Sequence, residues 1–349
     1  MEDLFNAIVD LVKDNTLDTK DTCVKFSEHG YKAFNFDKRH FHKIKGTDFK
    51  GKIAFIDGGN AEIIKSANIS LNLLRVYHCI YSKNKKVNSM KKDFYTFTHA
   101  KEKNGEIFYE TEIISPSDKI IPDKADLFIS SLDETIKQGI TRANISNVVN
   151  IVRRFSELKM ALMAIDNLEK GDIIVLDGSL QCTYTNESKY LDELYKKAND
   201  KGIIVSGISK TTTLMTDKGN SVGNALNKYR VSGKWCYHPV ADIKNNKHKA
   251  ELSFVKLHGK SKYIFRFEIY KEQHKHLNEA VSFLSNNCKD PVFIGYPYGL
   301  VDADKNARVS NNEKNMMKTY ISVKFGKDWE KIKESVSSTD AHEVLDKIS

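Results

Sequence analysis

Two aspartates each follow a short apolar run and precede a glycine, Asp57 in FIDGG and Asp177 in VLDGS. Such runs, closed by a glycine turn, are typical of buried strands, so each carboxylate is expected at a strand end. The carboxyl ends of parallel strands line the crevice where ligands bind, and glycine lets a phosphate or metal approach the backbone. The alternative is that each Asp-Gly pair is an ordinary turn after a strand.

The two carboxylates would repel each other at close range unless a cation neutralised them, so their convergence would favour a divalent metal. Carboxylate oxygens are the ligands that magnesium and manganese prefer. Two such ions can stabilise the attacking and leaving oxygens of a phosphodiester displacement and activate the attacking water. Asp57 and Asp177 therefore predict a metal site that hydrolyses a nucleic-acid backbone.

A third acid is predicted on the helix that precedes the second strand. Glu157, in RRFSELKMAL, lies among apolar positions near the boundary of the buried face. The alternative is an ion pair with Arg153 on a solvated face. Glu110 and Glu112, on the preceding strand, compete for the same role.

Further candidate residues lie near the C-terminus and after a late strand. Asp304 is predicted as the fourth ligand, and Asp302 is its alternative, because one of the two could instead favour a helix N-terminus. Tyr296 and Tyr298 flank a proline, where a phenol could bond a scissile phosphate or a ring could stack on a base, unless both simply pack. Lys210 ends the run ISK, where it could meet a phosphate oxygen or remain solvated.

The elements that would position these residues begin with an antiparallel meander, in GKIAFIDGG, SLNLLRVYHCIYS, DFYTFTHAKE and EIFYETEIIS. From about residue 144 to residue 165, apolar residues recur every three or four positions and predict one long amphipathic helix. A strand in GDIIVLDGS, a helix in NESKYLDELYKKANDKG and a strand in IIVSGISK follow. This order is the connectivity of an RNase H-like core.

We therefore predict an α/β fold with an RNase H-like mixed sheet and flanking helices. Residues 1–45 are expected to form a helical N-terminal extension, and residues 46–349 the RNase H-like domain, with an antiparallel β insertion at about 230–270. After it we expect a helix in HLNEAVSFLSNN, a strand and turn in VFIGYPYG, and C-terminal helices through AHEVLDKIS.

Composition excludes some classes of protein. The 349 residues are 40% hydrophobic, with no apolar run long enough to span a bilayer and no signal peptide at the N-terminus. The five scattered cysteines form no C-x-x-C pair, which argues against a zinc site or a disulfide framework and favours the cytoplasm. The net charge of +9 favours a polyanionic partner such as DNA, although a lysine-rich composition can also reflect an AT-rich genome.

In motif content and motif order the chain resembles the NurA family from about residue 50 to its end. The resemblance rests on FIDGGNAEI, RRFSELKMAL, IIVLDGSL, ISKTT, GYPYGLVDADKNAR and AHEVLD. It implies an RNase H-like, manganese-dependent nuclease with 5′–3′ exonuclease and single-strand endonuclease activity on DNA. It also implies a role in the resection of double-strand breaks, a homodimer, and a HerA-type hexameric ATPase as partner.

The resemblance assigns the family's catalytic acids to Asp57, Glu157 and Asp177, and its tyrosine to Tyr296. At the last metal-site position, where the family is expected to carry histidine, this chain has Asp304. That departure keeps a carboxylate ligand and bears on the choice between manganese and magnesium.

Two other functions compete with the nuclease. Actin-like and sugar-kinase ATPases also place Asp-Gly turns at strand ends, but they need duplicated halves and a Gly-Thr-rich hairpin, whereas GNAEII follows Asp57. A noncatalytic scaffold of RNase H-like fold could hold DNA without cutting it. The intact set of predicted acids argues against the scaffold.

Overall fold

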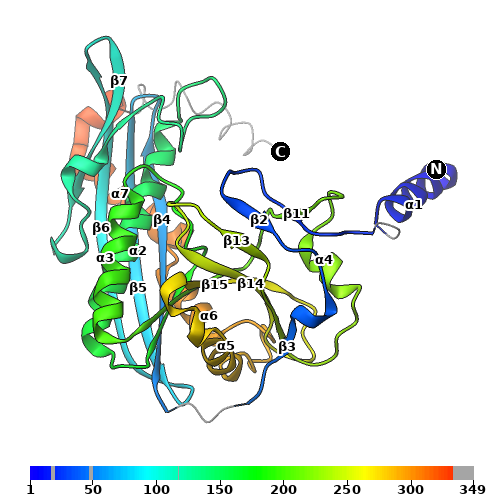
Figure 1. The fold of residues 1–349 in the computed structure, drawn as a ribbon. Coiled ribbons are helices and arrows are strands. Elements are labelled where there is room, and N and C mark those ends of the chain that lie inside the picture. Colours follow the sequence, from blue (N-terminus) through cyan, green and yellow to red (C-terminus); the bar gives the residue numbers. More distant parts are fainter. Residues whose placement is uncertain (17–19, 47–49, 117, 333–349) are drawn as a thin grey trace. The chain divides into compact units, whose positions relative to one another are not determined.

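The structure is a computed structural model that describes residues 1–16, 20–46, 50–116 and 118–332 (Figure 1). The chain forms two compact units. The first unit comprises Met1–Phe49, Asp177–Gln181 and Ile204–Tyr298, and the second comprises Lys50–Leu176, Cys182–Ile203 and Gly299–Ser349. No helix among the described residues combines the length and the apolar character that a bilayer span requires.

The second unit is built on a mixed sheet with the strand order β9-β4-β5-β6-β7-β8. Neighbouring strands are antiparallel except β4 and β9, which are parallel. The Lys52 N–H donates to Asp172 Oδ1 (2.7 Å) where this parallel pair begins. The strands are β4 (Lys52–Lys65), β5 (Ile69–Ser82), β6 (Lys85–Lys103), β7 (Glu106–Ile114), β8 (Phe128–Ser130) and β9 (Ile173–Asp177).

Helices cover both faces of this sheet. On one face α2 (Val148–Ala164) packs on β4 and β5, and α3 (Glu187–Lys201) lies beside it (Figure 1). On the other face are α6 (Tyr298–Ala307) and α7 (Asn311–Phe325), the latter packed on the apolar side chains of β4 and β5. Strand β5 is therefore buried at nearly every position, because helices cover it on both sides.

The remaining short elements of the second unit are 3₁₀ turns that connect or extend the longer ones. They are η2 (Asp118–Ile120), η3 (Lys124–Leu127), η4 (Ile145–Asn147), η5 (Ile165–Asn167) and η7 (Gly326–Asp328).

The first unit has an antiparallel sheet with the order β3-β12-β14-β15-β10. Two smaller sheets pair β1 with β11 and β2 with β13. The strands are β1 (Val24–Lys25), β2 (Tyr31–Ala33), β3 (Phe41–Lys43), β10 (Ile204–Ser209), β11 (Met215–Thr216), β12 (Trp235–Tyr237), β13 (Ala241–Ile243), β14 (Ala250–Lys256) and β15 (Phe265–Tyr270). The helices are α1 (Glu2–Thr16), α4 (Val222–Asn227) and α5 (Leu277–Asn286), with turns η1 (Lys38–His40) and η6 (Lys271–His276).

The predicted fold class is confirmed, because a mixed sheet with flanking helices forms in the predicted order of elements. The long helix expected over residues 144–165 appears as η4, α2 and η5 in succession. Antiparallel strands occupy the region predicted as a β insertion at about 230–270. The division into residues 1–45 and 46–349 stays a prediction.

Several local predictions were wrong. Among the described residues of 1–45, α1 and the short turn η1 are helical, and the segment from Val24 onward forms short strands, because β2 and β3 pair with strands about 200 residues later. The expected strand in VFIGYPYG is a turn, since Pro291 and Pro297 lack the N–H of a strand ladder and Gly295 adopts a left-handed φ of +93°. The predicted helix in AHEVLDKIS lies outside the described residues.

Candidate active site

Three carboxylates form a half-buried cluster at one end of the parallel strand pair. Asp57 lies on β4, Asp177 is the last residue of β9 and Asp304 lies on α6; one ligand oxygen of each lies within 4.8 Å of the others. Ile56 and Leu176 are the last pair of the parallel register, so Asp57 and Asp177 are neighbours where this pairing ends. Of the two strands, β9 ends here, whereas β4 continues through Gly58 and Gly59 to Lys65, paired with β5, so the predicted strand end and glycine turn at Asp57 were wrong.

Close packing of α6 on β4 brings Asp304 to the cluster. A Cβ atom on Gly299 would lie 2.0 Å from Phe55 Cδ2, so only glycine allows the helix to approach this ring. The Cys79 thiol also donates to the Gly299 carbonyl (3.3 Å). Phe55 lies two residues before Asp57, and alternate residues of a strand share a face, so α6 covers the face from which the Asp57 side chain projects.

Asp302, the alternative to Asp304, has different partners. Its carboxylate accepts hydrogen bonds from Lys86 Nζ (3.0 Å) and the Tyr81 hydroxyl (3.1 Å). It therefore ties α6 to β5 and β6, while Asp304 is the member of the pair that joins the cluster.

Cationic and hydroxyl groups surround the carboxylates. Lys210 Nζ lies 2.7 Å from Asp177 Oδ2, and the Tyr296 hydroxyl donates to Asp177 Oδ1 at 3.4 Å. Lys210 also lies 5.7 Å from the centre of the Tyr296 ring. Arg308 donates to Asp304 Oδ2 at 2.9 Å. Sequence reasoning missed Arg308, although its i,i+4 spacing from Asp304 on a predicted helix was a usable signal.

Glu157 is buried on α2 over the backbone of β4, with two arginine partners. Its side chain is 12% exposed and pairs with Arg153 (3.6 Å) and Arg154 (3.9 Å). It lies over Gly58, where an added Cβ would come within 2.6 Å of Glu157 Oε1. The alternative ion pair with Arg153 thus forms, though not on a solvated face. Within the described part of the chain, Glu157 does not join the three clustered aspartates, and its role as a ligand stays a prediction.

The other predicted residues lie elsewhere. Tyr298 is 40% exposed at the start of α6. Glu110 on β7 pairs with Lys101 (2.9 Å), and Glu112 lines a separate hollow of about 310 Å³. Neither glutamate belongs to the three-carboxylate cluster found among the described residues.

A buried ionic group in the first unit fixes the loop that follows Asp177. Glu268 Oε2 accepts the Leu180 N–H (2.6 Å) and lies 3.2 Å from His248 Nε2, while Arg266 pairs with the other oxygen. Gly207 lies beneath the same loop, where an added Cβ would be 2.5 Å from the Gly178 carbonyl oxygen. No local sequence pattern indicates this group.

Low pH is expected to weaken the contacts of Glu268 that hold this loop, because it protonates the carboxylate. Burial alone would raise the pKa of Glu268, but Arg266, His248 and the Leu180 N–H outweigh burial and lower this pKa to about 2, from 4.5. A lowered folded-state pKa stabilises the fold above about pH 4.5, and this contribution is lost as the pH falls toward 2.

We therefore expect Glu268→Gln to lower the melting temperature at neutral pH and to flatten its decline between about pH 4.5 and pH 2. Thermal unfolding over a pH series measures both effects. Glu193→Gln, at an exposed position on α3, is the control and should leave the slope unchanged. An equal slope in wild type and Glu268→Gln would contradict the prediction.

Comparisons with known proteins identify a family. Residues 51–309 match the model of the NurA domain, a range that includes all three clustered aspartates. A search of curated proteins finds no significant match.

Among solved structures, the chain is similar to the NurA nuclease from Sulfolobus solfataricus, with 14% identity and a TM-score of 0.49 over 83% of this chain and 90% of that chain. It is also similar to Ciona intestinalis endonuclease V in complex with a 23mer DNA (13% identity, TM-score 0.39, 79% and 92% covered). The catalytic domain of human endonuclease V follows, with 11% identity, a TM-score of 0.37, and 77% and 89% covered.

Proposed function

We infer the function from the premise that this chain belongs to the NurA family, whose domain model matches residues 51–309. We propose that the protein is a divalent-metal-dependent nuclease that hydrolyses phosphodiester bonds in DNA. The observation that supports this most is the cluster of Asp57, Asp177 and Asp304, with one oxygen of each within 4.8 Å of the others.

The donor set fits a hard divalent cation. Three carboxylates at this separation repel one another strongly, and oxygen ligands of this kind suit manganese and magnesium. Asp57, Asp177 and Asp304 would hold the metal, and we propose Glu157 as a further ligand. The chemistry that such ions supply is charge neutralisation at the phosphate and a lower pKa for an attacking water.

The surrounding side chains would orient the DNA strand. Lys210, whose Nζ lies 2.7 Å from Asp177 Oδ2, would contact a phosphate oxygen, and the Tyr296 hydroxyl is a donor at the same carboxylate. The Arg308 guanidinium, whose side chain is 73% exposed, can bind a phosphate with two parallel N–H groups. Tyr298 offers an exposed ring on which a base can stack.

The finer features of the proposal follow from the family resemblance. We propose manganese as the physiological ion, 5′–3′ exonuclease and single-strand endonuclease activities, and a role in resecting double-strand breaks in the cytoplasm. We also propose a homodimer that works with a HerA-type hexameric ATPase. Size-exclusion chromatography of the protein with and without such an ATPase tests both assemblies.

The test of the proposed function is metal-dependent DNA cleavage. With Mn²⁺, purified protein is expected to degrade linear DNA, and EDTA is expected to abolish cleavage while DNA binding persists, because lysines and arginines supply the phosphate contacts. Gel electrophoresis measures cleavage, and a filter-binding assay measures binding. ATP hydrolysis without DNA cleavage would instead support the kinase-like alternative, and DNA binding without cleavage at any metal concentration would support the scaffold.

A further inference from the structure

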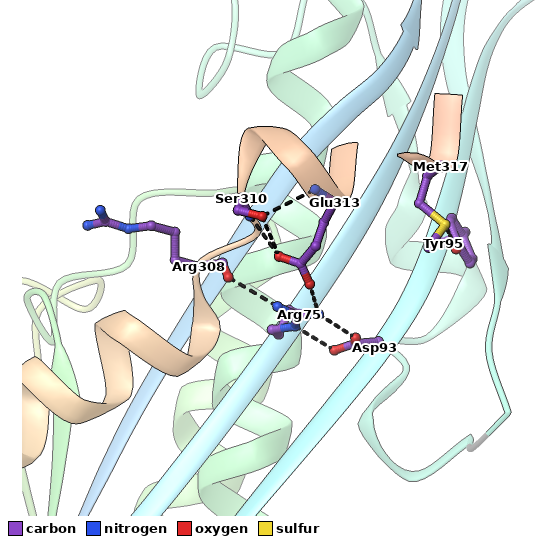
Figure 2. A network of polar contacts seen from close by, with 7 residues as sticks. All are labelled: Arg75, Asp93, Tyr95, Arg308, Ser310, Glu313 and Met317. Carbon is purple, nitrogen blue, oxygen red and sulfur yellow. Dashed lines mark hydrogen bonds and ion pairs between the residues drawn. The ribbon is translucent and has the colours of Figure 1, made fainter. Parts of the chain in front are cut away.

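A buried arginine on the central strand β5 joins several separate segments of the second unit (Figure 2). Arg75 is 7% exposed, and its guanidinium binds both oxygens of Asp93 on β6, at 2.8 and 2.7 Å. A further N–H reaches Glu313 on α7 at 3.0 Å, and another donates to the backbone carbonyl of Arg308 at 3.1 Å. One side chain thus holds the sheet, the start of α7 and the end of α6 together.

The segment that Arg75 holds lies directly on β4, next to the acid cluster. Gly59, two residues after Asp57, pairs with Arg75 in the sheet register. An added Cβ on Gly59 would lie 2.3 Å from the Ala307 carbonyl oxygen and 3.3 Å from the Arg308 Cα atom. The end of α6 therefore rests on the bare backbone of β4, on the face from which the Asp57 side chain projects.

Arg308 connects this contact to Asp304. Its backbone N–H donates to the Asp304 carbonyl (3.0 Å), and its side chain donates to Asp304 Oδ2 (2.9 Å). A shift of the Arg308 backbone would thus move the last turn of α6 and the carboxylate that this turn carries. The contact between Arg75 and the Arg308 carbonyl is a polar link from the sheet to the backbone directly after this turn.

The start of α7 depends on the same guanidinium in a different way. Glu313 and Ser310 form a capping box, and the Ser310 backbone N–H together with Arg75 lowers the pKa of Glu313 to about 2. This contact stabilises α7, which carries none of the clustered carboxylates. The two contacts of Arg75 can therefore be separated by mutation.

We propose that Arg75 is a positioning residue for the metal site: by holding the Arg308 backbone carbonyl against β4, it sets Asp304 at metal-binding distance from Asp57. This inference rests on the proposed metal-dependent nuclease. Arginine suits the role because its planar guanidinium has five N–H donors in fixed directions. The ammonium group of lysine concentrates its donors on one nitrogen and cannot reach all of these acceptors together.

The test is the affinity for Mn²⁺, measured by isothermal titration calorimetry on the full chain without DNA. Arg75→Lys keeps a positive charge between Asp93 and Glu313 but loses the planar guanidinium that donates to Asp93, Glu313 and the Arg308 carbonyl at once. We expect its Kd for Mn²⁺ to rise about tenfold or more, the range seen when outer partners of metal ligands are changed. With Mn²⁺ near saturation, kcat for DNA cleavage should fall while KM for DNA stays within about twofold, because the DNA contacts remain.

Two matched variants separate positioning from general stability. Glu313→Gln weakens the α7 cap and one Arg75 contact but keeps the Arg308 contact, so it should lower the melting temperature and leave the Mn²⁺ affinity unchanged. Lys86→Met removes the ion pair between β6 and Asp302 on α6, and it should also leave the affinity unchanged.

The results decide between outcomes. Wild-type Mn²⁺ affinity in Arg75→Lys, or an equal loss in Glu313→Gln and Lys86→Met, would overturn the positioning role. If Arg75→Lys does not fold, Asp93→Asn replaces it: this variant keeps the guanidinium but removes its charged anchor, and an unchanged Mn²⁺ affinity there would overturn the inference. Absence of Mn²⁺ binding by the wild type would instead refute the proposed function itself.

Discussion

Asp57→Ala and Asp177→Ala are each expected to reduce Mn²⁺-dependent DNA cleavage by more than about a hundredfold, since even the outer partners of metal ligands contribute 10- to 100-fold. The fold should persist, because removing one of three crowded carboxylates relieves repulsion between like charges. DNA binding should persist as well. Degradation of linear DNA, a binding assay and thermal unfolding measure the three properties.

Asp302→Asn is the matched control for these variants. Asp302 lies on the same helix as Asp304 but outside the cluster, and the asparagine oxygen can still accept from Tyr81 and Lys86, so the substitution should leave cleavage within about twofold of wild type. Normal cleavage by both Asp57→Ala and Asp177→Ala would show that the active site has been assigned to the wrong residues.

Gly299→Ala is expected to destabilise the protein by about 1–3 kcal/mol, the usual cost of overpacking a tight interior. The sign of the change in unfolding free energy is informative, because a glycine-to-alanine change in a helix with free space around it stabilises the fold by up to about 1 kcal/mol. Here the new Cβ would lie 2.0 and 2.1 Å from two atoms of the Phe55 ring, and Phe55 is fully buried. Helix α6 must move away from β4, so cleavage should fall together with stability.

Gly223→Ala is the control, because Gly223 is also the second residue of its helix, α4, and an added Cβ would meet nothing closer than 3.9 Å. That variant should be as stable as wild type or more so in urea unfolding. Equal stabilities of Gly299→Ala and Gly223→Ala would contradict the close packing of α6 on the sheet.

The sequence alone was sufficient to predict the elements whose side-chain period is regular. The apolar runs before Asp57 and Asp177 formed neighbouring strands, and the three- and four-residue spacing around Glu157 formed α2. The clustering of Asp57, Asp177 and Asp304 could be anticipated because two apolar runs followed by Asp-Gly and a late acidic helix are visible locally, although β4 does not end at Asp57 as predicted.

Other features depend on partners that no local pattern indicates. Arg75 meets the Arg308 carbonyl across 233 residues, and Leu180 meets Glu268 across 88. The short strands after Val24 are set by pairing with distant strands. Helical spacing put Glu157 at the edge of a buried face, but its pairing with Arg153 and its position over Gly58 depend on the packing of α2 against β4.

The parallel pairing of β4 with β9 also bears on how the site is assembled during folding. The bond between Lys52 and Asp172 joins residues 120 positions apart, and the meander and α2 lie between them. Closing so long a loop has an entropic cost that local hairpins do not share. The meander can therefore form early from neighbouring segments, while Asp57 and Asp177 approach each other only once this loop closes, when burial of the hydrophobic interior can offset the growing repulsion.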